Sequence, residues 1–312
     1  MRGNLIAGGS IPGLARAAFT LQRPDGRSIP VLIAVPHAGR AYPPELTADM
    51  RDARTTALKL EDRFVDAVAR QAAALCSASL LIAHAPRAMI DLNRDPGDLD
   101  LTMFTASEDE KAAMRRGMPR GGAHRSRSTR GLGLFPRRLS GVGEIWRSAM
   151  RVEDASRRIA AVHAPYHEAL AATLGEIAQG WGEALLIDLH SMPDLPPRIG
   201  GQPPATHVIG DRFGGSCRRD LVEVALSALE GAGAESAYNR PYAGGYSLDR
   251  HGRPRQGVHA IQLEIARSLY LDGPGQGPGE GVATQARIIA DTVGAVAAHM
   301  ARDGLGWAQA AE

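Results

Sequence analysis

The sequence is poor in several residue types that particular classes of protein require. Only two of its 312 residues are cysteines, Cys76 and Cys217, and they do not form a closely spaced pair. This argues against a disulfide scaffold and against a zinc site built from thiolates. A bound metal would have to be held by histidine and carboxylate side chains, and ten histidines are present. Long hydrophobic runs are also missing, since no uninterrupted apolar stretch approaches the roughly 20 residues that cross a bilayer.

The chain has no marked excess of charge of either sign. Lys and Arg number 36 against 34 Asp and Glu, which gives a formal net charge of +2. A protein dedicated to a polyanion usually carries a larger basic excess. The arginine-rich stretch over 115–138 suits either nucleic acid or a solvated loop, and it lacks the interleaved aromatics on which bases stack. We expect a solvated loop and expect neither nucleic acid nor a membrane as a partner. The sequence leaves the oligomeric state open.

The N-terminal residues do not have the pattern of an export signal. Residues 1–19 are weakly basic and are interrupted by Gly and Pro, so they lack the continuous apolar core of a secretory signal. Free cysteines suit a reducing compartment. We therefore expect a cytoplasmic protein, with a weakly amphipathic N-terminus on a membrane surface as the alternative.

Short apolar runs alternate with segments of helical periodicity along the whole chain, which predicts an α/β fold with helices on both faces of a sheet. No shift in composition divides the chain, so we expect one domain over 1–312, with an N-terminal extension (1–28) and an Arg- and Gly-rich, irregular excursion (108–138). The predicted strands are 29–35, 80–83, 89–92, 185–189, 207–210 and 259–265, and the predicted helices are 60–75, 153–177, 216–229 and 282–300.

Two histidines follow predicted strands. His37 comes after the strand at 29–35, and His190 comes after the strand at 185–189. In open α/β sheets the ligand crevice lies beyond the carboxyl ends of the strands, so two imidazoles there could share one metal ion. Alternatively, each is a loop histidine bonded to the backbone. Asp188 lies on the same side of its strand as His190 and could orient that imidazole.

Three acidic residues are candidates for the carboxylates of such a site. Glu61 and Asp62 begin the helix that follows His37, where either could be a metal ligand or could only complement the helix dipole. Glu264 lies inside an apolar strand, and a carboxylate is rarely buried without a partner. It is either ion-paired, for example to Arg267, or held in a site as a general base.

An Asn-Arg pair follows the predicted strand at 89–92. Asn93 and Arg94 together offer the planar donors that bind a carboxylate. The structural alternative is that Arg94 pairs with a neighbouring acid such as Asp91. Arg87, slightly upstream, could either join an anion pocket or pair at the surface.

Eight short motifs follow one another in an order that resembles a known family. They are PHAGR (36–40), EDRFVD (61–66), RAMIDLNR (87–94), TRGLGLFPRR (129–138), HAPYHEAL (163–170), LLIDLHSMP (185–193), NRPYAGGY (239–246) and GVHAIQLEI (257–265). Taken together they resemble the N-formylglutamate amidohydrolases, which are similar in fold to the zinc carboxypeptidase and aspartoacylase group. The resemblance covers about residues 30 to 272.

The resemblance implies a three-layer α/β/α sandwich around a mixed, largely parallel sheet of the zinc-carboxypeptidase-like, phosphorylase/hydrolase-like type, with one catalytic Zn2+ per chain. By the same resemblance His37, Asp62 and His190 would be the zinc ligands, with Asp62 favoured over its neighbour Glu61. Glu264 would match the general base, and Arg87 is placed like a donor to the oxyanion or to a carboxylate.

The resemblance also implies a small-molecule N-acyl amino acid substrate. Asn93 and Arg94 would bind its carboxylate, and Tyr242, Gly244 and Gly245 would line the substrate loop. The implied activity is zinc-dependent hydrolysis of N-formyl-L-glutamate to formate and L-glutamate, as in histidine catabolism. The alternatives are a zinc-dependent deacylase or carboxypeptidase-like hydrolase of another N-acyl amino acid and, in another class, a non-catalytic module that binds anions or nucleic acid.

Overall fold

One mixed sheet organises the molecule. The computed structural model describes residues 4–26, 28–117, 127–198, 200–273 and 277–310, with the backbone alone described over 303–310. Over these residues eight strands pair in the order β1-β2-β4-β3-β9-β12-β10-β11. Their bounds are β1 (Leu5–Gly8), β2 (Phe19–Gln22), β3 (Val31–Val35), β4 (Ser79–Ala83), β9 (Ala184–Met192), β10 (His207–Gly210), β11 (Ser236–Tyr238) and β12 (Val258–Ala266).

The centre of the sheet is parallel and its edges are mixed. Strands β4, β3, β9 and β12 run parallel to one another. β10 is antiparallel to β12 and parallel to β11, while β1 and β2 add an antiparallel edge next to β4. The residues predicted as an N-terminal extension therefore supply two strands of the sheet. The predicted mixed, largely parallel sheet is confirmed at its centre, where the carboxyl ends of β3, β9 and β12 meet at one edge.

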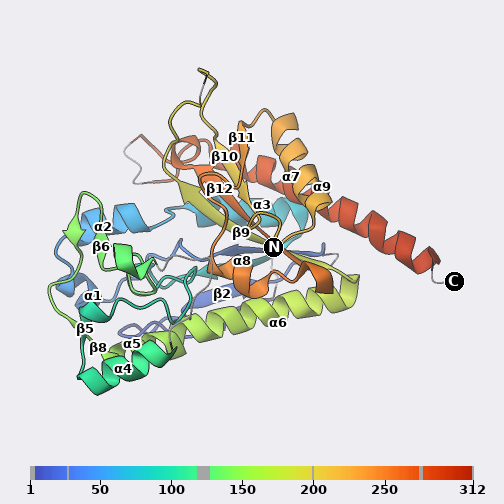
Figure 1. Ribbon diagram of the computed structural model, residues 1–312. Coiled ribbons are helices and arrows are strands. Elements are labelled where there is room, and N and C mark those ends of the chain that lie inside the picture. Colours follow the sequence, from blue (N-terminus) through green and yellow to red (C-terminus); the bar gives the residue numbers. More distant parts are fainter. Residues whose placement is uncertain (1–3, 27, 118–126, 199, 274–276, 311–312) are drawn as a thin grey trace.

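Helices cover both faces of the sheet, as predicted (Figure 1). One face packs against α3 (Val65–Cys76), α7 (Arg219–Gly231) and α9 (Val282–Ala310). The other face packs against the long α6 (Ala164–Trp181) and the short α8 (Tyr246–His251). Within the described residues no helix is long and apolar enough to span a membrane.

The remaining elements lie outside the main sheet. The helices are α1 (Pro44–Asp49), α2 (Ala53–Leu60), α4 (Glu108–Gly117) and α5 (Val152–Arg158), with a π-helical segment, η3 (Ile159–His163), between α5 and α6. Two small sheets pair β5 (Phe104–Thr105) with β8 (Met150–Arg151) and β6 (Arg138–Leu139) with β7 (Gly143–Glu144). Short 3-10 turns are η1 (Leu101–Met103), η2 (Ser128–Arg130), η4 (Pro254–Gln256) and η5 (Arg267–Leu269).

The central strands are apolar on both faces because both faces are covered. In β3 the odd-numbered side chains, such as Ile33, pack toward α3 and α9, and the even-numbered ones, such as Leu32, pack toward α6. β9 and β12 follow the same alternation at first: Leu186 and Ala260 lie on the α6 side. Nearer their carboxyl ends this same face changes from apolar to polar. The side chains that mark the change are Asp188 and His190 on β9 and Gln262 and Glu264 on β12.

Two predictions near this edge differ from the structure. The predicted helix at 60–75 is confirmed as α3 but begins five residues later, at Val65, after α2 has ended at Leu60. Between them the Asp62 amide donates to the His37 carbonyl at 2.9 Å, and Phe64 takes a left-handed backbone with φ of 56°, which ends helical geometry. The predicted strand at 89–92 is a turn, because the Met89 amide bonds back to the carbonyl of Pro86.

Two further differences concern longer segments. The excursion predicted as irregular contains α4, which starts with a capping box: the Ser107 amide donates to Glu110, and the Glu110 amide donates to the Ser107 hydroxyl. Residues 118–126 of the same stretch lie outside the described residues. β9 extends to Met192, so His190 lies on the strand and does not follow it. The predictions for β3, β4, β10, β12 and α7 are confirmed within a few residues, and α9 starts at Val282 as predicted but continues ten residues beyond the predicted end, to Ala310.

Candidate metal centre and active site

Three predicted residues come together at the carboxyl edge of the sheet. His37 follows β3, His190 is near the end of β9, and Asp62 lies in the turn between α2 and α3. Each offers one ligand atom, and these atoms all lie within 4.8 Å of one another. The Asp62 Oδ2 atom is 2.9 Å from His190 Nδ1 and 3.5 Å from His37 Nδ1. All three side chains are buried.

The donor atoms of this cluster fit a divalent metal ion. His37 Nδ1 is buried and has no hydrogen-bond partner among the described residues, although it faces the Asp62 carboxylate. The far nitrogen of each imidazole is bonded to a carboxylate: His37 Nε2 to Asp91 at 2.7 Å, and His190 Nε2 to Asp188 at 3.0 Å. A carboxylate behind a ligating histidine fixes its tautomer and leaves the near nitrogen for the metal. Two imidazoles and one carboxylate are a donor set that zinc uses in catalytic sites.

Asp62 and His190 each stabilise the charged form of the other. Burial alone would raise the pKa of Asp62, but its hydrogen bond with His190 and the nearby His37 imidazole outweigh burial and hold the pKa well below its usual range. Burial alone would lower the pKa of His190, but Asp188 and then Asp62 raise it well above the ordinary value. The carboxylate of Asp62 is therefore ionised and ready to act as a ligand.

Several contacts fix Asp62 and distinguish it from Glu61. The Arg267 guanidinium donates to Asp62 Oδ1 at 3.2 Å, and the Ser191 hydroxyl donates to the same oxygen at 3.2 Å. The Glu61 carboxylate instead bonds to Arg63 at 2.8 Å. Of the two neighbouring acids that the sequence offered, the structure places Asp62 beside both imidazoles.

Glu264 lies next to this cluster on β12. It is the register partner of His190 on the adjacent parallel strand. The Gln262 amide donates to Glu264 Oε1 at 2.8 Å. Burial raises the pKa of Glu264 to about 7, against the lowering effect of the nearby His190 charge. Arg267, the ion-pair partner considered for this residue, bonds to Asp62. Glu264 can therefore exchange a proton near neutral pH, which a general base requires.

The predicted arginine near the site is held by a carboxylate of the same site. Arg87 Nε donates to Asp91 Oδ2 at 2.9 Å, and the other oxygen of Asp91 accepts from His37. Burial alone would lower the pKa of Arg87, but the charges of Asp91 and then Asp62 raise it. The guanidinium stays charged close to the metal cluster.

Asn93 lies in the middle of the site and Arg94 at its rim. Asn93 Nδ2 is 3.3 Å from His190 Nε2 and 3.3 Å from the Gln262 side-chain oxygen. Arg94 donates from Nε to the Leu132 carbonyl and from Nη1 to the Asn93 carbonyl. Its Nε atom also lies 3.9 Å from Asp91 Oδ2, the pairing considered as the alternative, and the side chain is 12% exposed. The guanidinium is therefore held by two carbonyls and by one carboxylate of its own loop.

The predicted substrate loop contacts Asn93 through glycine. A Cβ atom at Gly245 would lie 2.5 Å from Asn93 Oδ1, so no larger residue fits without moving Asn93. Gly244 has φ of +96°, a backbone conformation that side chains rarely adopt. Tyr242 lies on the other side of the loop, where burial raises the pKa of its phenol and the Glu264 charge raises it further. The loop, Asn93 and Glu264 are therefore close to one another.

Three polar residues have a place in the site that the sequence did not indicate, since Asp91 and Arg267 were considered only as ion-pair partners of Arg94 and Glu264, and Gln262 was given no role. Asp91 bonds to His37, Gln262 links Asn93 to Glu264, and Arg267 holds Asp62. The signal for Gln262 was present: Asp188 and His190 on β9, and Gln262 and Glu264 on β12, share the face of neighbouring strands at positions i and i+2. Asp91 and Arg267 depend on turns that periodicity does not reveal.

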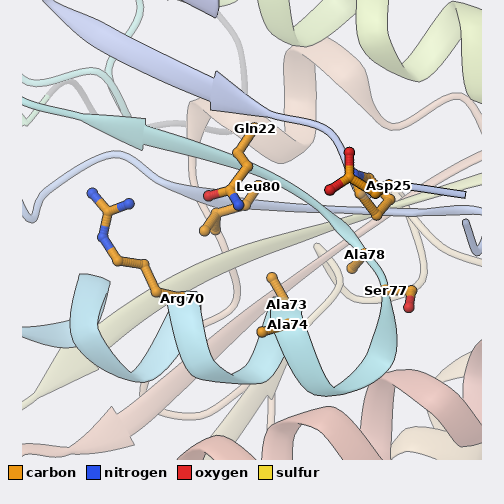
Figure 2. A pocket seen from close by; sticks show the side chains of 9 residues that line it. Gln22, Asp25, Arg70, Ala73, Ala74, Ser77, Ala78 and Leu80 are labelled. Atoms are coloured by element: carbon orange, nitrogen blue, oxygen red, sulfur yellow. The ribbon is translucent and has the colours of Figure 1, made fainter. Parts of the chain in front are cut away.

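A separate pocket lies away from the carboxyl edge of the sheet, and its lining differs from the metal cluster (Figure 2). It lies between β2 and α3, near the amino end of β4, whereas the cluster lies at the carboxyl ends of the parallel strands. Its polar lining is not a set of metal ligands. The lining residues are Gln22, Pro24, Asp25, Arg70, Ala73, Ala74, Ser77, Ala78 and Leu80.

A buried His-Asp-His cluster beside a buried glutamate, at the carboxyl edge of an α/β/α sandwich, is typical of a metal-dependent hydrolase. Comparison with known proteins gives the family. The N-formylglutamate amidohydrolase family matches residues 29–271. The chain therefore belongs to this family of amide hydrolases, as the eight motifs predicted.

Individual relatives agree with this assignment. The chain is 31% identical over 250 residues to an N-formylglutamate deformylase of Pseudomonas aeruginosa, a match that covers 78% of this chain and 83% of the relative. A Pseudomonas putida protein of the same name is 26% identical over 262 residues, covering 78% and 82% of the two chains. The crystal structure of an N-formylglutamate amidohydrolase from Ralstonia eutropha JMP134 superposes with a TM-score of 0.79 at 29% identity, over 92% of this chain and 99% of that one.

Proposed function

We propose that the protein is a zinc-dependent deformylase that hydrolyses N-formyl-L-glutamate to formate and L-glutamate. The observation that carries this proposal is the contact of Asp62 with both His37 and His190, directly beside Glu264. Relatives that match over most of the chain are named for the same reaction. We further propose that the described residues act as one hydrolase domain in the cytoplasm, within histidine catabolism.

His37, Asp62 and His190 would hold the zinc ion, through the two Nδ1 atoms and a carboxylate oxygen. When bound, zinc supplies Lewis acidity, which acidifies water and polarises a carbonyl. Two imidazole nitrogens and a carboxylate oxygen match the ligands of catalytic zinc sites.

Glu264 would move the proton of the reaction. It takes a proton from the attacking water while the water oxygen bonds to the formyl carbon, and it delivers that proton to the glutamate nitrogen as the carbon–nitrogen bond breaks. A pKa of about 7 suits both steps, because the group is then neither too weak a base nor too weak an acid at neutral pH. Gln262 keeps one carboxylate oxygen in place through its 2.8 Å hydrogen bond.

Arg87 would stabilise negative charge on the formyl oxygen. Its Nε contact with Asp91 fixes the plane of the guanidinium and leaves its terminal N–H groups as donors. Loss of a single oxyanion donor costs about 3 kcal/mol of transition-state stabilisation in a well-studied protease. The Asp91 carboxylate would thus link the oxyanion donor Arg87 to the metal ligand His37.

Asn93 and Arg94 would bind a carboxylate of the substrate and so orient the amide over the metal cluster. Tyr242, Gly244 and Gly245 would close the opposite wall of the substrate site. The small glycines let the loop backbone approach Asn93 closely, as the 2.5 Å distance from a Cβ at Gly245 indicates.

The proposal is tested by comparing kcat/KM for N-formyl-, N-acetyl- and N-succinyl-L-glutamate with zinc-loaded protein. We expect the formyl substrate to be preferred, with formate and L-glutamate released in equal amounts. A preference for the acetyl or succinyl compound would instead identify a deacylase of another N-acyl amino acid. Salt-sensitive nucleic-acid binding that needs no metal, with no hydrolysis, would identify a binding module.

A further inference from the structure

A second group of histidines lies behind the proposed carboxylate site. His163 and His167 come from the HAPYHEAL motif, to which sequence and proposed chemistry assign no role, and His251 ends α8. All three imidazoles are buried, with exposures of 1%, 0% and 6%. The rings of His163 and His167 are 4.5 Å apart, and those of His167 and His251 stack at 5.2 Å.

Two of these histidines hold the backbone on either side of Asn93. His167 Nε2 is 2.8 Å from the Leu92 carbonyl oxygen, and His163 Nε2 is 3.0 Å from the Arg94 carbonyl oxygen. A carbonyl oxygen only accepts hydrogen bonds, so both Nε2 atoms carry the proton. The peptide unit before Asn93 and the one after Arg94 are thus each fixed by an imidazole donor, so the two donors bracket the Asn93-Arg94 pair.

The third histidine joins this arrangement to α8. Because His167 donates through Nε2, its Nδ1 atom accepts, and it accepts from His251 Nε2 at 2.9 Å. The other end of α8 contacts the Asn93 side chain, since the Ser247 amide donates to Asn93 Oδ1 at 2.9 Å. α8 therefore contacts this segment twice, once directly at the Asn93 side chain and once through His251 and His167 at the Leu92 carbonyl.

The helical segment η3–α6 places the imidazoles of His163 and His167 on the same side. His163 is the last residue of the π-helical segment η3, and His167 lies four residues later in α6, so both side chains project from one side of the helix. π-helical turns inside longer helices are frequent at functional sites. Here the π-helical turn places the two imidazoles against the carbonyl oxygens of Leu92 and Arg94.

The three imidazoles act as neutral hydrogen-bonding groups. Burial lowers the pKa of His163 to about 4 and that of His251 to about 3, and burial also lowers the pKa of His167. At neutral pH each ring therefore has one donor and one acceptor nitrogen, which the chain of contacts requires.

We propose that His163, His167 and His251 are positioning residues that hold Asn93 and Arg94 in the geometry that binds the substrate carboxylate. This inference rests on the proposed function only for the identity of the substrate. The positioning itself is a property of the contacts with Leu92, Asn93 and Arg94.

His163 offers the sharpest test because it makes one defined contact with the Arg94 carbonyl. His163→Met removes the donor and keeps an apolar side chain of similar size, whereas His163→Gln keeps an N–H at the end of a side chain of similar reach. The matched control is His207→Met, which removes another buried imidazole whose Nε2 bonds to Gln285 on α9. If His163→Met does not fold, His163→Asn replaces it, since the shorter amide does not reach the carbonyl.

Two measurements are made on zinc-loaded protein. The first is hydrogen exchange of the segment 91–94, whose Asn93 and Arg94 amides bond within the turn to Asp91. The second is steady-state kinetics with N-formyl-L-glutamate and with its two monoamides, each of which lacks one carboxylate. We expect His163→Met to speed exchange in this segment and to raise KM by about tenfold to a hundredfold with a smaller change in kcat.

A positioning role also predicts which substrates and which variants show the increase in KM. The increase in KM should be absent for the monoamide that lacks the bound carboxylate, His163→Gln should restore most of the wild-type KM, and His207→Met should change neither exchange at 91–94 nor KM. Equal effects of His163→Met on all three substrates, or unchanged exchange at 91–94, would overturn the inference.

Failure of the proposed function gives a different result. If the wild-type protein does not hydrolyse N-formyl-L-glutamate, the substrate assignment is wrong, and calorimetric binding of L-glutamate replaces KM. Weaker binding and faster exchange in His163→Met, restored in His163→Gln, still support positioning. Unchanged binding and exchange contradict it.

Discussion

His190 and Glu264 face the same side of the sheet as register partners on two adjacent parallel strands. The pairing places a candidate metal ligand and a buried carboxylic acid side by side without the help of any loop. One strand further along the sheet, β3 leads into His37, and the turn at Asp62 closes the cluster. The chemistry therefore depends on the rigid centre of the fold, where three parallel strands end together.

Glu264→Gln should separate catalysis from metal binding. Glutamine keeps the size of the side chain but cannot accept the proton of water, and general base catalysis typically contributes about 10²- to 10⁴-fold. We expect kcat to fall within this range while zinc content stays at the wild-type level. Activity assays and metal analysis of the same preparation check both parts. Glu223→Gln on the exposed face of α7 is a control that should leave kcat unchanged.

Asp62→Asn and Glu61→Gln form a matched pair that tests the third ligand. The Asp62 carboxylate faces both imidazoles, and the Glu61 carboxylate faces Arg63. We expect Asp62→Asn to weaken zinc binding by at least about tenfold, because a neutral amide is a poor ligand and leaves the cluster without its negative charge. Glu61→Gln should retain zinc affinity. Competition with a zinc chelator measures both, and a reversed order would make Glu61 the ligand.

The metal-free protein should become less stable as the pH rises through the range in which Glu264 ionises. Its pKa is raised in the folded state to about 7 from 4.5, so the folded protein holds the proton more tightly than the unfolded chain does. Below pH 4.5 both states are protonated and Glu264 costs no stability. Above pH 7 the buried carboxylate is ionised, and the difference corresponds to about 3 kcal/mol of free energy of unfolding.

Glu264→Gln removes this titration. The variant should therefore be more stable than the wild type at pH 8, and the advantage should shrink as the pH falls from 7 toward 4.5. Urea unfolding of metal-free protein at several pH values measures the difference. A gain that is constant with pH would mean that the variant acts through packing and that Glu264 is not held protonated by burial.

Arg94→Ala should affect substrates according to their carboxylates. The guanidinium is fixed by the Leu132 and Asn93 carbonyls, next to Asp91, and we propose that its second terminal nitrogen donates to the substrate. We expect KM for N-formyl-L-glutamate to rise by about tenfold or more, since a charge-assisted contact of about 1.5–3 kcal/mol is lost. The monoamide that lacks the contacted carboxylate should show little change. The same rise for both monoamides would remove Arg94 from carboxylate recognition.

Gly245→Ala should disturb the site through Asn93. The added methyl group would lie 2.5 Å from Asn93 Oδ1, so the amide has to move away from Gln262 and His190. We expect kcat/KM to fall by about tenfold to a hundredfold. Gly294→Ala on α9, where nothing lies within 4 Å of the added atom, should instead raise stability by about 0.5–1 kcal/mol without affecting activity.

The sequence predicts the central strands well. Helices cover both faces of these strands, so each strand appears in the sequence as a continuous apolar run. The run at 31–35 is uniformly apolar, and the residues that follow β3 and end β9 carry the histidines. Local turns are harder to predict. The break between α2 and α3 depends on the left-handed backbone of Phe64 and on a hydrogen bond from Asp62 to His37, residues 25 positions apart, and neither leaves a periodic pattern.

The candidate site shows the same contrast. The residues that the family motifs carry, such as His37, Asp62 and Glu264, lie close together in the structure. The residues that hold them are found only in three dimensions: Arg267 reaches back to Asp62 across 205 positions, and Asn93 bonds to Gln262 across 169. Such contacts follow from strand order and register, which the sequence alone does not specify.

The most direct test is the number of zinc ions bound per chain, measured in the wild type, in His37→Ala and in His190→Ala. We predict about one ion per chain in the wild-type protein and nearly none in either variant, with circular dichroism showing that both variants remain folded. Wild-type zinc content in the variants, or deformylase activity in a protein that carries both substitutions, would contradict the assignment of the metal to these two imidazoles.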